Sequence, residues 1–462
     1  MAELRLDQIA ERTKGKIIQG APSFTFSKFN IDSRQTEPGE LFFAIKAQRN
    51  GHDFVSSALE KGASGAVISQ NISSVPKDFA LIRVKDTLLA LQELAKSLLL
   101  EHKVSVIGIT GSNGKTTTKE FASSILSPRF HVLKSEKNFN NYLGLPLTLL
   151  RLEEEHEIAV LEMGMNAHGE IRALTRIAPP DISVITNVNP VHLEFFKNLE
   201  DIAQAKKEIL EGTKEEGIAV LNGDDPLVRK MGNDWNGRKI YFGLSSGENV
   251  HAQNIKYGDY TGMTFELSYG NRRENVRFPF FYESYLYNLL AALGVAFALS
   301  LPLEEILSQI SALKPFSMRG SLVFLEKDIK LIDDSYNSNP KALESALKGL
   351  AALPSKRKIA VLGDMLELGK KEAEFHFQAG RQVAKWCWDV LVGVGALSQH
   401  MLKGALSAGM DKSQAFSFHD SEEAADKVFS LLEKGDFILV KGSRAVKMEK
   451  IIMGLKEKLK GS

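Results

Sequence analysis

The chain has 462 residues, 44% of them hydrophobic and 25% charged, and this length predicts about three domains. Its 58 Lys and Arg residues balance 57 Asp and Glu residues, which argues against a protein whose main task is to grip a nucleic-acid backbone. The single cysteine, Cys387, excludes an internal disulfide and fits a reducing compartment.

We expect a cytoplasmic protein without a targeting segment or membrane span. Charged side chains interrupt any signal-peptide core in residues 1–20. The most apolar run, residues 289–299, is far shorter than the ~20 residues that cross a bilayer.

The first 84 residues predict a small α/β domain. Residues 41–45 and 65–68 are apolar runs typical of buried strands, and residues 54–61 predict a helix that Gly62 closes. Leucines at helical spacing over residues 86–101 predict a helix that leads into a second domain.

Residues 85–314 predict a central α/β domain. Its candidate strands alternate with helix-length segments, which predicts a mostly parallel sheet covered on both faces; they are residues 104–109, 158–161, 182–185 and 218–221. Residues 249–281 alternate like antiparallel strands, and residues 285–299 predict a helix.

A third, Rossmann-like α/β domain is predicted for residues 315–462. The α/β pattern returns there with candidate strands at residues 330–332, 358–362, 390–392 and 437–440. We therefore predict an α/β protein of three domains, with boundaries near residues 84 and 315.

A glycine-rich segment that follows the strand at 104–109 carries the sharpest chemical signal; it contains Gly111, Ser112, Asn113, Gly114, Lys115, Thr116 and Thr117. Its glycines allow backbone N–H groups to approach phosphate oxygens, Lys115 supplies positive charge, and the Thr116 hydroxyl can bind Mg²⁺. The usual spacing would place the first glycine where this chain has Ile109. We predict ATP or GTP binding, with an incidental glycine-rich turn as the alternative.

Polar residues that follow later strands are candidates for a metal site, because ligands of open α/β sheets bind at the carboxyl ends of strands. Glu162 follows residues 158–161 and could hold Mg²⁺ opposite Thr116, or it could be a solvated or capping residue. His192 follows the strand at 182–185, where a hydrogen-bonded loop histidine is the alternative.

Three further positions have ordinary structural alternatives. The pair Lys206 and Lys207, on a helical stretch, is typical of a solvated helix face. Asp333 and Asp334 close the strand at 330–332 and form either a site or an Asx turn with a helix cap. The segment at 442–444 could bind an anion or be a plain loop.

Motifs along nearly the whole chain resemble those of the Mur ligases. The first domain contributes residues 32–34, 38–45 and 51–54, and the central domain contributes the short phosphate loop together with residues 138–146, 162–165 and 169–171. The third domain contributes residues 333–340, 362–369, 441–445 and 448–449. Two of these motifs, residues 362–369 and residues 441–445 with 448–449, resemble those of the family member that adds D-alanyl-D-alanine to UDP-N-acetylmuramoyl-tripeptide.

The resemblance implies ATP-driven amide formation with Mg²⁺, two ions in all, and a carbamylated lysine at Lys206. It implies catalytic roles for Lys115, His192, Lys206 and Arg319, and metal ligation by Thr116, Glu162 and His192. Asn288 would bind adenine, Arg319 the γ-phosphate and Asp334 the ribose. Substrate binding is implied for Ser33, Arg34, Asn138, Asn140, Asn141, Tyr336, Asn337 and Asn339.

One stretch departs from the family pattern. The family has Gly-x-His-Asn shortly before the adenine-binding asparagine, whereas this chain has Tyr282-Glu283-Ser284-Tyr285. Tyr282 or Tyr285 could stack on the base instead. The alternatives to the expected monomeric enzyme are a Mur-type ligase with a different amine substrate and a non-catalytic nucleotide-dependent regulator.

Overall fold

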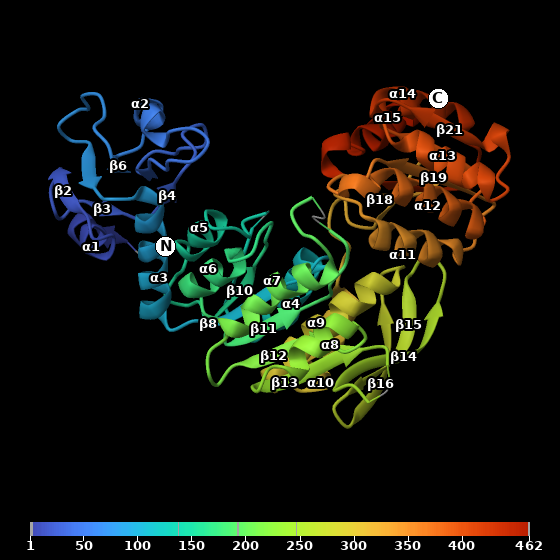
Figure 1. Ribbon diagram of the computed structural model, residues 1–462, viewed down its shortest axis with the longest axis horizontal. Coiled ribbons are helices and arrows are strands. Elements are labelled where there is room, and N and C mark those ends of the chain that lie inside the picture. Colours follow the sequence, from blue (N-terminus) through green and yellow to red (C-terminus); the bar gives the residue numbers. More distant parts are fainter. Residues whose placement is uncertain (1–2, 137, 192–193, 246, 461–462) are drawn as a thin grey trace.

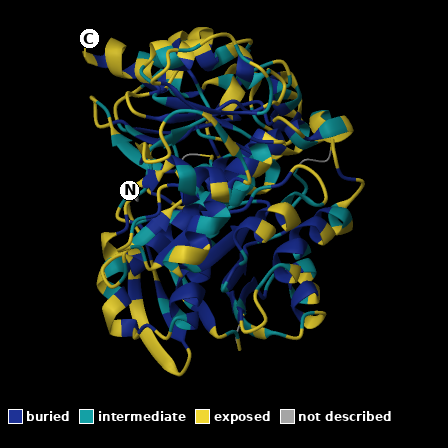
Figure 2. Ribbon diagram, turned by 90° about the vertical axis from the view of Figure 1, so that its left-hand side faces the viewer, coloured by how far each residue is buried: buried dark blue, intermediate teal, exposed yellow. Residues whose placement is uncertain are grey.

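The computed structural model describes residues 3–136, 138–191, 194–245 and 247–460. It has a three-domain α/β architecture, and Figure 1 shows the N-terminal (blue) and C-terminal (orange to red) domains on either side of the central domain (green to yellow). Figure 2 shows that the strands are mostly buried, while the outer faces of the helices are exposed. Among the described residues, no helix combines the length and hydropathy needed to cross a membrane.

The N-terminal domain is built on a mostly parallel sheet. Its strand order is β2 (Lys16–Gln19), β7 (Ala80–Arg83), β6 (Gly65–Ile68), β5 (Leu41–Phe43) and β4 (Phe29–Asn30), with β2 antiparallel. A short pair, β1 (Leu4–Arg5) and β3 (Thr25–Phe26), lies beside α1 (Leu6–Arg12). The helix predicted over 54–61 is α2 (Val55–Glu60), preceded by a 3₁₀ turn, Gly51–Phe54, that the Asn50 side chain caps.

Helix α3 (Thr87–His102) joins the first two domains. The Asp86 carboxylate accepts hydrogen bonds from the N–H groups of Leu88 and Leu89, which fixes the start of the helix. Leu91 and Leu94 are buried in one apolar cluster that contains side chains of both domains. The helix therefore belongs to the packing of both domains.

The central domain contains the largest sheet, whose parallel portion carries the phosphate loop. The strand order is β16 (Arg272–Phe278), β15 (Met263–Tyr269), β14 (Val250–Tyr257), β13 (Arg238–Gly243), β12 (Ile218–Asn222), β11 (Ile182–Ile185), β8 (Ser105–Thr110), β10 (Ile158–Glu162) and β9 (Val132–Lys134). The expected antiparallel pairing holds for β14–β15 and β15–β16, but β14 also pairs in parallel with β13. We did not predict β13, because its charged first residues obscure the strand pattern.

Helices cover both faces of this sheet, as the alternating pattern predicts. They are α4 (Lys115–Leu126), α5 (Gly144–Leu149), α6 (Glu170–Ile177), α7 (Leu199–Glu211), α8 (Pro226–Asn233), α9 (Glu283–Ala298) and α10 (Leu303–Ala312). Helix α9 is buried along most of its length, which explains its near-continuous apolar sequence.

The C-terminal domain has a parallel sheet with one antiparallel edge. Its strand order is β17 (Ser321–Phe324), β18 (Lys330–Asp334), β22 (Asp436–Lys441), β19 (Arg357–Gly363), β20 (Val390–Val394) and β21 (Ala415–Phe418). The helices are α11 (Pro340–Ala351), α12 (Glu372–Lys385), α13 (Ser398–Ser407), α14 (Ser421–Leu431) and α15 (Glu449–Lys460). The four predicted strands are present, and the edge strands β17 and β21, which are only half-buried, escaped prediction.

Candidate active site

The candidate site lies at the carboxyl ends of neighbouring parallel strands. Strand β8 pairs with β10 on one side and β11 on the other, and β12 follows β11. The phosphate loop follows β8, Glu162 ends β10, and Thr186 follows β11. Ligands of open α/β sheets bind at this edge.

Two glycines give the phosphate loop its shape. Gly114 caps the start of α4 with φ +84°, and Gly111 has φ +150°. A Cβ atom on Gly111 would lie 1.8 Å from Thr186 Oγ1, and one on Gly114 would lie 2.0 Å from Asn288 Oδ1. The loop is therefore closed in by neighbouring side chains as well as by its own backbone.

The side chain of Lys115, the first residue of α4, lies against the phosphate loop. Its ammonium donates a hydrogen bond of 2.7 Å to the carbonyl of Gly111. Burial lowers the pKa of Lys115, the Arg319 charge lowers it further, and Glu162 opposes that shift. An anionic ligand at the loop would favour the charged form of this lysine.

Glu162 and Thr116 form a pair on the wall of the site. The Thr116 hydroxyl donates to Glu162 Oε2 at 2.8 Å, and Asn140 Nδ2 donates to Glu162 Oε1 at 2.9 Å. The carboxylate is only 3% exposed. Its oxygen atoms are ligands of the type that Mg²⁺ prefers.

Within the described ranges, no group of three or more His, Cys, Asp or Glu side chains could hold a metal ion. A single carboxylate with a hydroxyl suits Mg²⁺ that also binds phosphate oxygens and water, so the residues fit that ion. His192, the predicted ligand of a second ion, lies outside the described residues.

The segment that follows β11 braces the phosphate loop, and sequence reasoning did not assign it this role. Thr186 Oγ1 donates to the Asn113 carbonyl at 2.6 Å, and the Asn113 N–H donates to Asn187 Oδ1 at 2.9 Å. Ser112 Oγ donates to the Asn189 carbonyl at 3.0 Å. The feature of the sequence that could have predicted this role is the run of polar residues directly after a buried strand.

Lys206 lies on the inner face of α7, so the interpretation of a solvated helix face is wrong. Its side chain is 2% exposed, whereas the neighbouring Lys207 is more exposed and pairs with Asp234 at 3.2 Å. Among the described residues, the Lys206 amine has no hydrogen-bond or ion-pair partner. Burial, with the charge of Lys115, holds the pKa of Lys206 well below its usual range.

The adjacent acids at the end of β18 have different surroundings. Asp333 accepts from the backbone N–H of Ser335 at 3.2 Å, which is the Asx turn considered above. Asp334 is buried and accepts a hydrogen bond of 2.6 Å from Lys441 Nζ. Burial raises the pKa of Asp334, and Lys441 opposes this shift.

The C-terminal domain reaches the phosphate loop directly. Asn339, whose Oδ1 caps α11, donates its side-chain amide to Asn113 Oδ1. Nearby, the guanidinium of Arg319 lies 4.0 Å from the centre of the Tyr336 ring, a cation–π contact. Tyr336 thus holds Arg319 at the boundary between the two domains.

Tyr282 and Tyr285, which replace the family motif, pack together with ring centres 5.0 Å apart. Both are largely buried, and burial raises their pKa values well above the usual range. A Cβ on Gly320 would approach both hydroxyls, at 3.0 and 2.9 Å. The rings therefore fill space at the start of α9, close to Asn288.

A cavity of about 1380 Å³ connects these elements of the central and C-terminal domains. The predicted residues that line it are Ser112, Asn113, Gly114, Lys115, Thr116, Thr117, Asn138, Asn140, Asn141, Glu162, Asn288, Arg319, Asp334, Tyr336, Asn337 and Asn339. Gly111 and Lys206 are not among the lining residues. Leu366, Glu367, Ser443 and Arg444, from motifs of the third domain, line it as well.

Ser33 and Arg34 lie apart from this cavity, in the N-terminal domain. Ser33 is buried, and Arg34 is exposed and bonded to the Asp32 carboxylate at 2.7 and 2.9 Å. The same domain has a second hollow of about 170 Å³, lined in part by His52 and Asp53 of the predicted 51–54 motif. His52 Nε2 accepts hydrogen bonds from the backbone N–H groups of Ser69 and Gln70.

Fold and site together define a three-domain α/β protein whose phosphate loop lines a cavity between the central and C-terminal domains. The Mur ligase middle domain matches residues 109–296, and the Mur ligase glutamate ligase domain matches residues 318–444. The chain belongs to the Mur ligase family.

Within this family, the chain is similar over its full length to one kind of enzyme. It is 35% identical to the UDP-N-acetylmuramoyl-tripeptide–D-alanyl-D-alanine ligase of Bacillus subtilis (strain 168), with 99% of each chain covered. A crystal structure of MurF from Acinetobacter baumannii matches with a TM-score of 0.90, 30% identity and 99% coverage of both chains. MurF ligase from Thermotoga maritima in complex with ADP matches with a TM-score of 0.84 and 30% identity, covering 94% of this chain and 98% of that one.

Proposed function

We propose that this protein joins D-alanyl-D-alanine to UDP-N-acetylmuramoyl-tripeptide in an ATP-dependent reaction that forms ADP and phosphate. The observation that carries the proposal is the cavity in which the phosphate loop and Glu162 face Arg319 and Asp334 of another domain. The full-length similarity to ligases of this kind supports it.

The chemistry requires activation of a carboxylate, which is a poor acyl donor. A carboxylate oxygen of the tripeptide attacks the γ-phosphorus of ATP, the bond to ADP breaks, and an acyl phosphate forms. The dipeptide amine then attacks the acyl carbon, and the tetrahedral intermediate expels phosphate as the amine loses its proton. Lys115 and Arg319 reduce the repulsion between the anionic carboxylate and the triphosphate.

ATP would lie along the phosphate loop, from Gly111 to Thr117. Lys115 contacts the β- and γ-phosphates, Asn288 the adenine, Arg319 the γ-phosphate and Asp334 the ribose. The position of Asn288 against Gly114 and the contact between Arg319 and Tyr336 support this orientation of the nucleotide. The ADP complex of the Thermotoga maritima relative supports nucleotide binding by the fold.

Thr116 and Glu162 would hold Mg²⁺, and His192 would contribute to a second ion. Bound there, Mg²⁺ withdraws negative charge from the phosphate oxygens. The residues of this chain prepare the position: Thr116 and Asn140 each hold one oxygen of the Glu162 carboxylate.

Lys206 would be carbamylated by CO₂. Carbamate formation needs a neutral amine, which attacks CO₂ and loses a proton. Burial and the lowered pKa favour that neutral form. The product is a carboxylate, the kind of group that can organise a metal site.

The three domains would divide the substrates among them, with residues 1–84 for the UDP-sugar end, 85–314 for ATP and 315–462 for the amine. Ser33 and Arg34 would contact the UDP-sugar portion. Asn138, Asn140 and Asn141 would bind the peptide portion beside the phosphate loop, opposite Tyr336, Asn337 and Asn339.

The decisive assay measures phosphate release with the tripeptide substrate, with and without D-alanyl-D-alanine. We expect release only when both are present, and mass spectrometry of the product should show the added dipeptide. Tripeptides ending in L-lysine and in diaminopimelate are compared. Turnover with a free amino acid but not with the dipeptide would overturn the proposal.

A further inference from the structure

A second buried lysine in helix α4 has no role in the function proposed above. Lys119 lies one helical turn after Lys115, and its side chain is 1% exposed. Burying an ammonium group is costly unless it is paired and hydrogen-bonded. A methionine could fill similar space without this cost, so a lysine at this buried position calls for a physical reason.

The contacts of Lys119 lead to the wall of the active site. Its ammonium donates a hydrogen bond of 2.5 Å to the carbonyl of Ser135, directly after the edge strand β9. It also lies 3.1 Å from Glu120 Oε1. Glu120 has a second partner, Lys134, at 2.5 Å, so the ion pair of Glu120 does not depend on Lys119 alone.

Ser135 continues the connection to Glu162. Its backbone N–H donates to the Val160 carbonyl at 3.1 Å, and its hydroxyl accepts from the Glu162 N–H at 3.1 Å. Ser135 is almost completely buried, so these bonds do not compete with bulk water. The end of β10, which carries the Glu162 carboxylate, is therefore held by a residue that Lys119 holds in turn.

We propose that Lys119 is a positioning residue that fixes the Glu162 carboxylate for Mg²⁺, acting through Ser135. Lys119 connects the helix that carries Thr116 to the strand end that carries Glu162, and these two side chains bond to each other at 2.8 Å. This inference rests on the proposed role of Glu162 as a Mg²⁺ ligand. Residues that orient a metal ligand typically contribute 10–100-fold to metal affinity or activity.

The test measures binding of a non-hydrolysable ATP analogue by calorimetry over a range of Mg²⁺ concentrations. We expect Lys119→Met to raise the Mg²⁺ concentration at half-saturation about tenfold or more, with analogue affinity in the absence of Mg²⁺ unchanged. The matched control is Lys134→Met, which also removes a lysine bound to Glu120 but leaves Ser135 untouched. A folded Lys119→Met protein with the Mg²⁺ dependence of the wild type would overturn the proposal.

A second pair of variants tests the same connection without changing the lysine. Ser135→Ala removes the acceptor of the Glu162 N–H, and Ser135→Thr keeps a hydroxyl. We expect a raised Mg²⁺ requirement for Ser135→Ala and rescue by Ser135→Thr. If Lys119→Met does not fold, the two Ser135 variants test the proposal instead. An unchanged Mg²⁺ requirement of Ser135→Ala would then overturn it.

The binding test also separates this inference from the function on which it rests. A wild-type protein that binds the analogue with Mg²⁺ but does not join D-alanyl-D-alanine to the tripeptide would refute the proposed function. The Mg²⁺ dependence of the variants would still decide the role of Lys119.

Discussion

At the scale of single residues, neighbouring side chains of the same type have opposite surroundings. Lys206 faces the interior and Lys207 the surface, because successive residues of a helix point about 100° apart. Asp333 closes a local turn, while Asp334 is buried against Lys441. Burial shifts the pKa of the inner member of each pair, downward for Lys206 and upward for Asp334.

Replacing Lys206 with alanine tests the carbamate. We expect Lys206→Ala to lose most ligase activity and to regain part of it with added short carboxylates such as formate or acetate, because the vacated space can admit them. Lys207→Ala is the control and should keep its activity, since it loses only a surface ion pair with Asp234. Full activity of Lys206→Ala without added carboxylate would exclude a role for a Lys206 carbamate in the reaction.

The buried lysine also predicts a pH dependence of stability. In CO₂-free buffer, the folded protein keeps Lys206 neutral at pH values where the unfolded chain still binds the proton, up to its usual pKa of 10.5. The unfolded state then binds more protons, so the free energy of unfolding should rise with pH between the lowered pKa and 10.5. Urea unfolding at several pH values should show a smaller rise for Lys206→Met than for Lys207→Met.

At the scale of elements, Gly114 and Gly169 are two helix caps that can be compared directly. Both cap the start of a helix with φ +84°, but a Cβ on Gly169 would meet nothing within 4 Å, whereas one on Gly114 would meet Asn288. Alanine at either position should cost about 1–2 kcal/mol of backbone strain. Only Gly114→Ala should weaken ADP binding, by about tenfold or more, which corresponds to about 1.4 kcal/mol or more. Calorimetry measures the ADP affinity of the Gly114→Ala and Gly169→Ala variants. Equal affinities of these two variants would contradict the role of Gly114.

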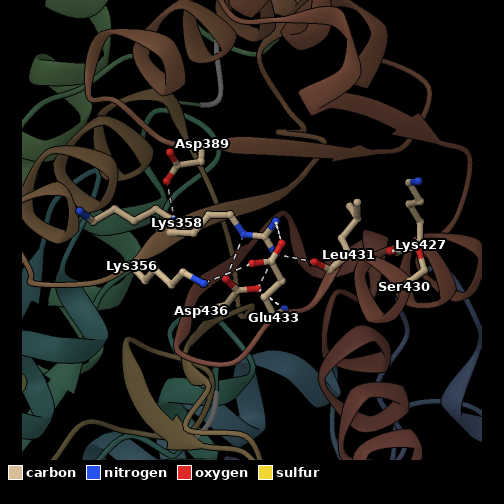
Figure 3. A network of polar contacts seen from close by, with 9 residues as sticks. Lys356, Lys358, Asp389, Lys427, Ser430, Leu431, Glu433 and Asp436 are labelled. Atoms are coloured by element: carbon tan, nitrogen blue, oxygen red, sulfur yellow. Dashed lines mark hydrogen bonds and ion pairs between the residues drawn. The ribbon is translucent and has the colours of Figure 1, made fainter.

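The C-terminal sheet is held at the end away from the cavity by a buried ion pair. Arg357, at the start of β19, bonds to both carboxylate oxygens of Asp436, at 3.0 and 2.7 Å, and to Glu433 (Figure 3). Asp436 is fully buried at the start of β22. The pair joins two central strands whose other ends carry Lys441 and the 364–369 loop.

Breaking this pair should affect stability but not chemistry. Asp436→Asn removes the buried carboxylate partner of Arg357 and leaves the more exposed Glu433 as its remaining partner. The cost should therefore stay below the about 3–5 kcal/mol that is typical when a buried charge loses its partner. We expect a lower midpoint of urea unfolding and, in native conditions, an unchanged KM for ATP. A changed KM at unchanged stability would contradict this assignment. Glu433→Gln removes the more exposed partner and should cost less.

At the scale of the whole molecule, the C-terminal domain contacts the central domain both at the nucleotide site and away from it. Asn339 reaches Asn113 across the cavity, and Tyr260 of the central domain packs against Phe437 with ring centres 5.7 Å apart. The apolar cluster of α9 continues into α11. Such contacts can guide a rigid domain as it closes over bound substrate.

We predict that this domain closes further over ATP and the tripeptide, which would keep water from the acyl phosphate. Small-angle X-ray scattering should show a smaller radius of gyration with both ligands than without them. Asn339→Asp keeps the cap of α11 but loses the amide donor to Asn113, and should weaken the change. Equal radii with and without ligands would contradict closure.

Sequence patterns located the parts of the site that depend on local chemistry. The phosphate loop needs two glycines and a lysine at fixed spacings within five residues, and the strand at 182–185 needs a short apolar run. Both patterns can therefore be recognised locally. The edge strands β17 and β21, by contrast, are half-buried and lack a strong pattern. The roles of Lys119 and Ser135 could not be predicted, because they meet only after β9 is placed beside α4.

The sequence by itself determined the three-part α/β organisation and the position of the phosphate loop, because hydrophobic periodicity and glycine placement act over a few residues. Only the tertiary structure decided which lysines lose their solvent, that Glu162 bonds to Thr116, and that Arg319 rests on Tyr336. These pairs lie far apart along the chain. Burial and charge pairing arise when the sheet edge and the third domain come together in space.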